Sequence, residues 1–114
     1  MKTATLLIFL LLNSVKALAA ASQQKPPETI IVITLENHHF SPSEVHFPSG
    51  QPVVLLIKNR DATAEEFESA ALKVEKILAA KGETVVHLRP TEHGHYTFVG
   101  EHHEKVARGV LIAD

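Results

Sequence analysis

Imidazole and carboxylate groups are the side chains of this sequence that could do metal chemistry. Glu101-His102-His103 places one carboxylate and two imidazoles directly after a strand-like segment that ends at Gly100. Carboxylate is a hard ligand and imidazole a borderline one, so together they suit iron, Cu(II), Mn(II) or Zn(II). The candidate metal ligands are Glu66, Glu68, Glu75, Glu101, His102 and His103. Because glutamates are common on exposed surfaces, the alternative for each single glutamate is a solvated side chain.

Sulfur ligands are missing from this set. The chain contains no cysteine, and its single methionine is Met1. A blue-copper site needs a cysteine thiolate, and sites that select Cu(I) use thiolate or thioether donors. The sequence therefore excludes type 1 copper and a soft Cu(I) site.

Most other histidines are expected on the surface. His46 and His87 each stand between two apolar neighbours, so in a strand they should face solvent. His38-His39 falls at a strand end, and His93 and His95 flank Gly94. A weak secondary metal site at either pair is the alternative. No nucleophile-elbow motif and no glycine-rich phosphate loop is present, which argues against a hydrolase or a nucleotide-binding protein.

The first 19 residues are typical of a secretory signal peptide. Lys2 precedes an apolar run, Leu6 to Leu12, and Ala17-Leu18-Ala19 forms a small-residue cleavage site, with cleavage after Ala21 as the alternative. The run is too short for a membrane span, which needs roughly 20 residues. We expect export to the periplasm and no membrane embedding after cleavage.

The rest of the chain divides into a flexible lead-in, residues 20–27, and one domain, residues 28–114. Loss of Lys2 and Lys16 leaves 9 Lys and Arg against 13 Asp and Glu, a net charge of −4. No basic stripe remains, so nucleic acid is not an expected partner.

Short segments rich in β-branched residues alternate with turn signals along this domain, which predicts an all-β sandwich or barrel. The expected strands are 29–35, 44–47, 52–58, 84–89, 95–99 and 109–113, with a break at Phe40-Ser41-Pro42. Residues 64–80 conflict with this pattern. Phe67, Ala71, Val74 and Leu78 recur at helical spacing, and Thr63 with Glu66 fits a capping box, so local propensity favours a helix.

Four groups of residues, taken in order, resemble one known family. They are Phe40-Ser41-Pro42 with Val45 to Gly50; Asn59 with Glu65 to Ser69; Leu72 to Ile77 with Gly82; and Gly94 to Phe98 with Gly100 to His103 and Gly109 to Leu111. The sequence is similar to cupredoxin-like domains of bacterial iron-uptake systems, especially the small periplasmic proteins of ferrous iron permease systems. The resemblance implies a Greek-key β-sandwich in which Glu66 to Ser69 is extended, with a short helix within residues 64–80 as a further option.

The resemblance also implies where a cupredoxin would hold copper. The cysteine position falls on Gly100, the second histidine on His103 and the methionine near Ala107. The first histidine falls near Glu65 or Glu66. One of the four ligands is therefore retained, and the resident ion would be copper or iron outside a type 1 site.

The implied function is periplasmic metal binding in ferrous iron uptake, by oxidising Fe(II) or handing it over to a membrane permease. Periplasmic iron-binding proteins would be further partners, and the sequence leaves enzymatic activity open. The alternatives are an envelope copper-binding or copper-delivery protein, and a metal-free β-sandwich interaction module.

Overall fold

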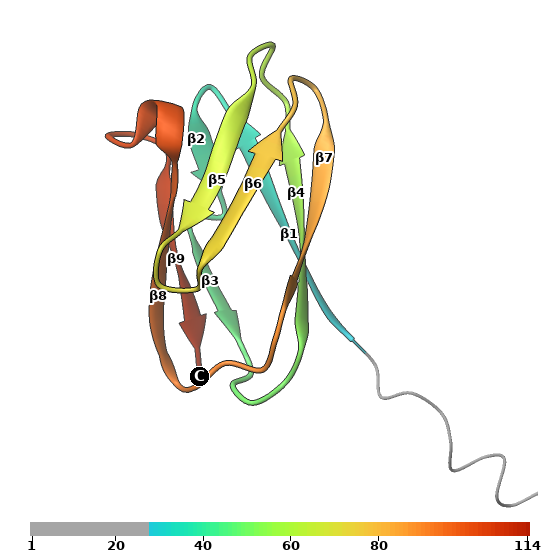
Figure 1. The fold of residues 1–114 in the computed structure, drawn as a ribbon, viewed down its shortest axis with the longest axis vertical. Coiled ribbons are helices and arrows are strands. Elements are labelled where there is room, and N and C mark those ends of the chain that lie inside the picture. Colours follow the sequence, from blue (N-terminus) through green and yellow to red (C-terminus); the bar gives the residue numbers. More distant parts are fainter. Residues whose placement is uncertain (1–27) are drawn as a thin grey trace, which may run out of the picture.

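Two β-sheets face each other in the computed structural model, which describes residues 28–114 (Figure 1). One sheet has the order β2-β1-β4-β7 and contains β1 (Thr29–Glu36), β2 (His39–Ser41), β4 (Val53–Asn59) and β7 (Glu83–Leu88). The other has the order β3-β9-β8-β5-β6 and contains β3 (Glu44–Phe47), β5 (Glu65–Ser69), β6 (Val74–Leu78), β8 (Gly94–Gly100) and β9 (Arg108–Ala113). The expectations for the signal peptide and the lead-in concern residues outside the described part.

Alternation of buried and exposed residues builds the core between the sheets. In β4, Val53, Leu55 and Ile57 are buried, while the residues between them are only partly covered. Three aromatic rings fill one end of the core. Phe40, Phe67 and Phe98 have ring centroids 5.1 to 6.0 Å apart, within the range in which aromatic pairs attract each other. The predicted all-β sandwich is confirmed.

Residues 64–80 form a β-hairpin, so the helix suggested by local propensity is wrong. β5 and β6 pair antiparallel, with Phe67 opposite Lys76, and β5 also pairs with β8. In this arrangement Phe67 is fully buried among the core aromatics. Burial of that ring and the pairing with β8 outweigh a helix preference that amounts to only tenths of a kcal/mol per residue. The extended conformation implied by the resemblance is confirmed.

The expected break near Phe40 is instead a short strand. β2 pairs with the end of β1 through the two-residue turn Asn37-His38, whose φ angles are 52° and 62°. Two successive positive φ angles are the signature of the hairpin turn that best matches the twist of paired strands. Asn37 suits the first of these positions, and His38 is carried at the tip of the hairpin.

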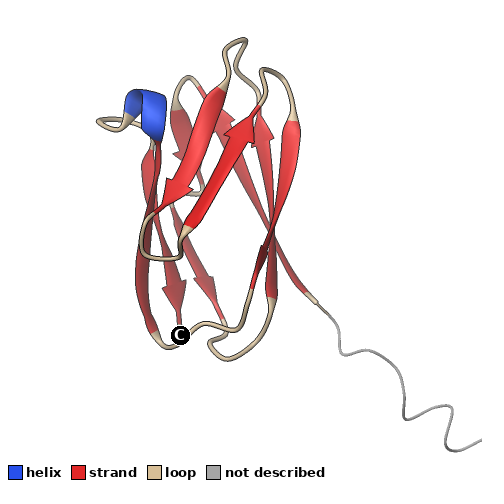
Figure 2. Cartoon of the chain, viewed as in Figure 1, coloured by secondary structure: helices blue, strands red, loops and turns tan. Residues whose placement is uncertain are grey.

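Three segments meet at one end of the sandwich: the β1–β2 turn, the start of β5, and η1 (Glu101–His103), a 3₁₀ turn that follows β8. Figure 2 shows η1 as the one helical segment among residues 28–114. Within those residues, no helix has the length and apolar character needed to cross a membrane.

Candidate metal centre

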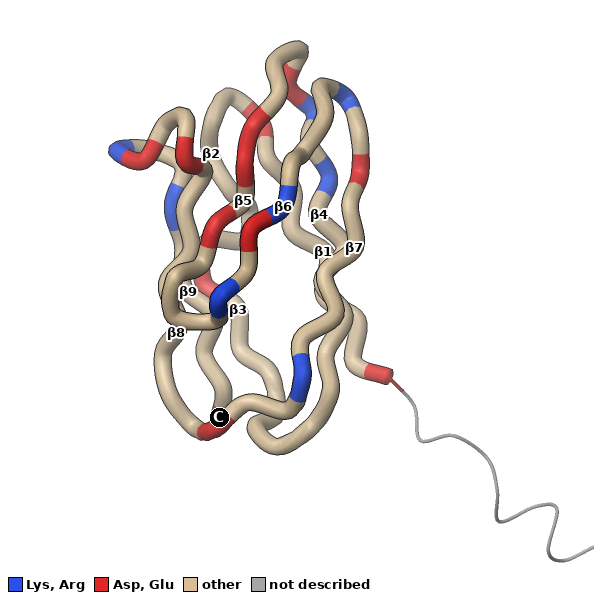
Figure 3. Tube along the Cα trace, viewed as in Figure 1, with Lys and Arg blue, Asp and Glu red and all other residues tan. Residues whose placement is uncertain are grey.

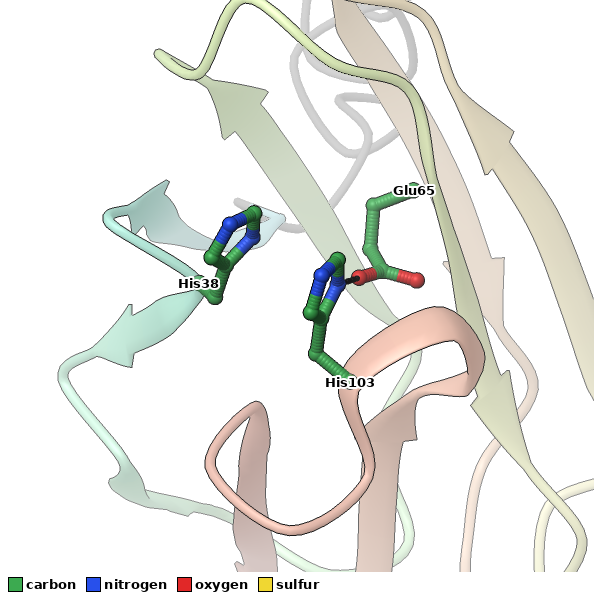
Figure 4. Close-up of side chains that lie close together, drawn as sticks. All are labelled: His38, Glu65 and His103. Atoms are coloured by element: carbon green, nitrogen blue, oxygen red, sulfur yellow. Dashed lines mark hydrogen bonds and ion pairs between the residues drawn. The ribbon is translucent and has the colours of Figure 1, made fainter.

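His38, Glu65 and His103 bring their potential ligand atoms within 4.8 Å of one another. His38 comes from the β1–β2 turn, Glu65 is the first residue of β5, and His103 is the last residue of η1. Figure 4 shows the His103 ring between the Glu65 carboxylate and the His38 ring. Two imidazoles and a carboxylate from three separate segments thus converge.

Glu65 is the buried member of this group. Along β5, Glu65, Phe67 and Ser69 face the interior, and the Glu65 side chain is only 2% exposed. Its Oε1 accepts the backbone N–H of Glu66 at 2.9 Å and that of His102 at 2.8 Å. Its Oε2 lies 2.8 Å from His103 Nδ1. A buried carboxylate is stable only with partners of this kind, and here both oxygens have them.

These partners determine the charge of Glu65. Burial by itself raises the pKa of its carboxyl by desolvation. The hydrogen bond from His103, the backbone N–H groups of Glu66 and His102, and the nearby His102 ring together outweigh desolvation and hold the pKa below its usual value. Glu65 is therefore an ionised carboxylate at neutral pH, as a metal ligand must be.

Gly100 provides the space that Glu65 occupies. A Cβ on residue 100 would lie 2.8 Å from Glu65 Cδ and 2.9 Å from Ala107 Cβ, closer than real Cβ contacts. Residue 100, where the resemblance places the blue-copper cysteine, therefore cannot carry a side chain while Glu65 keeps its place. A type 1 copper centre does not fit this chain, by donor chemistry and by space, whereas an ion that accepts oxygen and imidazole ligands does.

The two imidazoles of the group are stacked. The His38 and His103 rings have centroids 3.7 Å apart and planes inclined by 18°. Each side chain is more than one third exposed, so the site is open to solvent on this side. Nitrogen lone pairs lie in the ring plane, so one ring must rotate before both can bind the same ion.

His103 is held in the manner of many metal-binding histidines, which donate one ring N–H to a carboxylate. With a proton on Nδ1 toward Glu65, the lone pair of its Nε2 is free for an ion. The exposed His102 ring is a neighbour of the site, with its Nδ1 3.7 Å from Glu65 Oε1.

Three of the four predicted glutamates, Glu66, Glu68 and Glu75, lie on the outer face of the β5–β6 hairpin, and Glu101 of η1 is close to Glu66. Glu68 is directly opposite Glu75, and Figure 3 shows acidic positions close together on these two strands. A side-chain hydrogen bond to Glu101 is the main cause that raises the pKa of Glu66, with desolvation and the charges of Glu101, Glu75 and Glu68 adding to it. Desolvation, followed by the charges of Glu101, Glu75 and Glu104, raises the pKa of Glu68. These carboxylates form one repulsive cluster, separate from His103.

Of the predicted ligands, His103 is therefore part of the His38–Glu65–His103 group and His102 lies beside it. Glu65 and His38 were not in the predicted ligand set, although the resemblance placed the first copper histidine near Glu65 or Glu66, and His38-His39 was one alternative for a weak secondary site. The sequence did indicate that Glu65 is buried. Side chains of a strand alternate between its two faces, so if Phe67 is a core residue, Glu65 points inward and Glu66 outward. For His38 the sequence offered only the His38-His39 pair at a strand end, and the meeting with His103 depends on the tertiary fold, which brings the β1–β2 turn next to η1.

The chain matches a family model described as a cupredoxin-like domain over residues 3–113. The uncharacterized protein RP394 of Rickettsia prowazekii (strain Madrid E) is 37% identical over 82 residues, which are 72% of this chain and 66% of that protein. This chain thus spans slightly less than two thirds of that relative's length.

Similar solved structures point to the same fold. One similar structure is the metal-binding domain of the Cu(I)-exporting P-type ATPase CopA of Streptococcus pneumoniae D39, solved with Cu(I). It superposes with a TM-score of 0.70 at 16% sequence identity, and the alignment covers 80% of this chain and 90% of the CopA domain. Auracyanin A, a "blue" copper protein from Chloroflexus aurantiacus, has a TM-score of 0.66 at 16% identity, with coverage of 77% and 100%. At such identities the likeness shows the fold alone. By its sequence match and its two-sheet architecture, this chain belongs to the cupredoxin-like domain family.

Proposed function

We propose that this protein binds a transition-metal ion through His38, Glu65 and His103. The observation that carries the proposal is the Glu65 carboxylate: it is buried, ionised and hydrogen-bonded to a histidine that a second histidine covers. Such a carboxylate–imidazole arrangement recurs at protein metal sites. Two structural neighbours, the CopA domain solved with Cu(I) and the blue copper protein auracyanin A, bind copper, which supports the assignment.

The donor set favours Cu(II), iron or Zn(II) over Cu(I), because it contains oxygen and imidazole nitrogen but no sulfur. Among divalent ions, Cu(II) should bind most tightly in vitro. An ion bound at His103 Nε2 would leave Glu65 as the orienting acceptor. An ion bound at Nδ1 would release the proton that Glu65 now accepts, and Glu65 would become a ligand.

Ferrous iron uptake in the periplasm is the physiological setting that we propose, beside a membrane permease and iron-binding proteins. The family resemblance supports this setting, as does the chemistry, since oxygen and imidazole donors suit iron. The partly exposed histidines would let the ion be handed over. An activity that oxidises Fe(II) would need an electron acceptor such as dioxygen, and it would be seen as loss of Fe(II) faster than in buffer.

The outer glutamates are a second candidate for the ion. The pKa of Glu66 is raised chiefly by its hydrogen bond to Glu101 and that of Glu68 chiefly by desolvation, and nearby negative charges add to both; a bound cation would relieve this repulsion. This cluster of Glu66, Glu68, Glu75 and Glu101 would act as a separate oxygen-ligand site, or as the surface at which a cation first arrives.

Calorimetric titration with Cu(II), Fe(III), Mn(II) and Zn(II) tests the two candidates. We expect one-to-one Cu(II) binding that weakens in His103→Ala by more than the roughly 10- to 100-fold typical of losing an outer-shell partner. His87→Ala removes an exposed histidine of the β7 strand and should change nothing. Full binding by His103→Ala, together with loss in Glu66→Gln/Glu68→Gln, would move the site to the outer glutamates.

A further inference from the structure

Asp61 connects the metal-site histidine His38 to the loop between β4 and β5. Its Oδ1 accepts the backbone N–H of Asn37 at 2.6 Å, and its Oδ2 accepts the backbone N–H of His38 at 2.9 Å. Oδ2 also lies 3.6 Å from His38 Nδ1. The Asp61 carboxylate thus binds the backbone of both turn residues, Asn37 and His38, and also lies close to the His38 ring.

The turn needs such a partner because of its sequence. Both residues have positive φ angles, 52° for Asn37 and 62° for His38. Asn-Gly is the preferred sequence for a turn of this kind, and a histidine in place of the glycine makes the conformation less favourable. Hydrogen bonds from backbone N–H groups to an ionised carboxylate are among the stronger ones in proteins. They compensate here for the missing glycine.

Asp61 is itself held in place by buried groups. Its backbone N–H donates to Asn59 Oδ1 at 3.0 Å, and its carbonyl oxygen accepts the N–H of Lys81 at 3.0 Å. The Asn59 side chain is 2% exposed and donates to the carbonyl oxygens of Thr63, Leu78 and Ala79. The neighbouring Arg60 N–H donates to Leu35 O, at the end of β1. The carboxylate therefore projects from a rigid loop toward the turn.

We propose that Asp61 is a positioning residue of the metal site, because it holds the β1–β2 turn in the place that brings His38 next to His103. This inference rests on the proposed function, since it concerns the same site. Asp61 does not touch the ion; it acts through His38.

A double-mutant cycle on the purified protein tests this role, with Cu(II) as the probe. We expect Asp61→Ala to weaken Cu(II) binding by roughly 10-fold or more, as for other outer-shell partners. On a His38→Ala background, the same substitution should cause no further loss, because its target is gone. Asp61→Asn keeps one acceptor oxygen for the turn and should retain part of the affinity. Asp114→Ala removes a carboxylate that contacts a different histidine, His46, and should have no effect.

Amide hydrogen exchange in the metal-free protein provides an independent readout. Asp61→Ala should speed the exchange of the Asn37 and His38 amides, while the core amides of β4 keep their protection. Wild-type affinity in Asp61→Ala, or an equal loss on both backgrounds, would overturn the positioning role. If Asp61→Ala does not fold, Asp61→Asn decides between the same outcomes.

Failure of the proposed function would look different. In that case the wild type would not bind Cu(II), or His103→Ala would bind it unchanged, and the positioning role would fall with the site. Binding that depends on His103 and His38 but not on Asp61 would reject the positioning role alone.

Discussion

At the scale of single residues, Glu65 and Gly100 depend on each other. Glu65 stands near the position that the family resemblance gives to the first copper histidine, and Gly100 stands at the cysteine position. The Glu65 side chain fills the space into which a side chain at residue 100 would point. Glu65 therefore keeps its present place only with a glycine at residue 100.

Gly100→Ala should disturb both the fold and the site. The added Cβ would lie 2.8 Å from Glu65 Cδ and 2.9 Å from Ala107 Cβ. We expect the free energy of unfolding to fall by about 1–3 kcal/mol, as for other overpacked sites, and Cu(II) affinity to fall as Glu65 is displaced. Urea denaturation and calorimetry measure the two effects.

Gly50→Ala is the matched control for that change. Gly50 has a φ of 72°, and an added Cβ would have nothing within 4 Å. Alanine at residue 50 would therefore strain the backbone locally, at a position outside the metal site. It should lower stability and leave Cu(II) affinity unchanged. If Gly100→Ala bound Cu(II) with wild-type affinity, Cu(II) binding would not depend on the present position of Glu65.

At the scale of elements, β5 separates two kinds of carboxylate by its alternation. Its inward positions carry Glu65, whose pKa is lowered by hydrogen-bond partners, and its outward positions carry Glu66 and Glu68, whose pKa values are raised. One strand thus holds a stabilised charge on one face and repelling charges on the other.

Glu68→Gln should stabilise the protein at neutral pH. Because the pKa of Glu68 is raised in the folded state, ionisation of Glu68 disfavours folding, and the penalty is fully present above the raised pKa. As the pH falls through the raised pKa toward the ordinary value of 4.5, the wild type regains this stability and the difference between the two proteins disappears. Thermal unfolding from pH 8 to pH 4 measures the change.

Salt and a second substitution make that experiment specific. High salt should shrink the gain from Glu68→Gln, since it screens repulsion between exposed charges. Glu92→Gln, an exposed glutamate outside this cluster, should give little gain at any pH. A gain in Glu68→Gln that persists unchanged at pH 4 would show that the ionisation of Glu68 is not its cause.

At the scale of the whole molecule, the candidate site bridges the two sheets. His38 belongs to the hairpin of the four-stranded sheet, while Glu65 and His103 belong to elements of the five-stranded sheet. Figure 1 shows the β1–β2 hairpin, β5 and η1 at the same end of the sandwich. An ion held by all three residues would therefore link the sheets directly.

Cu(II) should accordingly raise the melting temperature of the protein. Free ion at 100 times its dissociation constant stabilises a folded protein by about 2.7 kcal/mol. In a domain of this size that corresponds to a shift of roughly 10–20 °C, reduced by any binding to the unfolded chain. Scanning calorimetry with and without Cu(II) measures the shift, and chelation should reverse it. His103→Ala should show a much smaller shift; an equal one would place the ion elsewhere.

The strand pattern and the chemistry of the ligands could be predicted from the sequence. Alternating apolar residues placed most strands of the sandwich to within a residue or two, because burial between two sheets demands that alternation. It also placed His46 and His87 on the surface, where the structure has them. Because residues 28–114 contain neither cysteine nor methionine, this part of the chain offers only oxygen and nitrogen donors in any fold.

Only the tertiary structure decided which oxygen and nitrogen donors meet. Residues 64–80 carry a helical pattern, and pairing with β8 made them strands; that pairing turned Glu65 rather than Glu66 toward the interior. His38 reaches His103 because a turn held by Asp61 crosses the end of the sandwich. Local sequence determines which face a residue occupies within its own element, whereas contacts between distant segments depend on how the sheets pack.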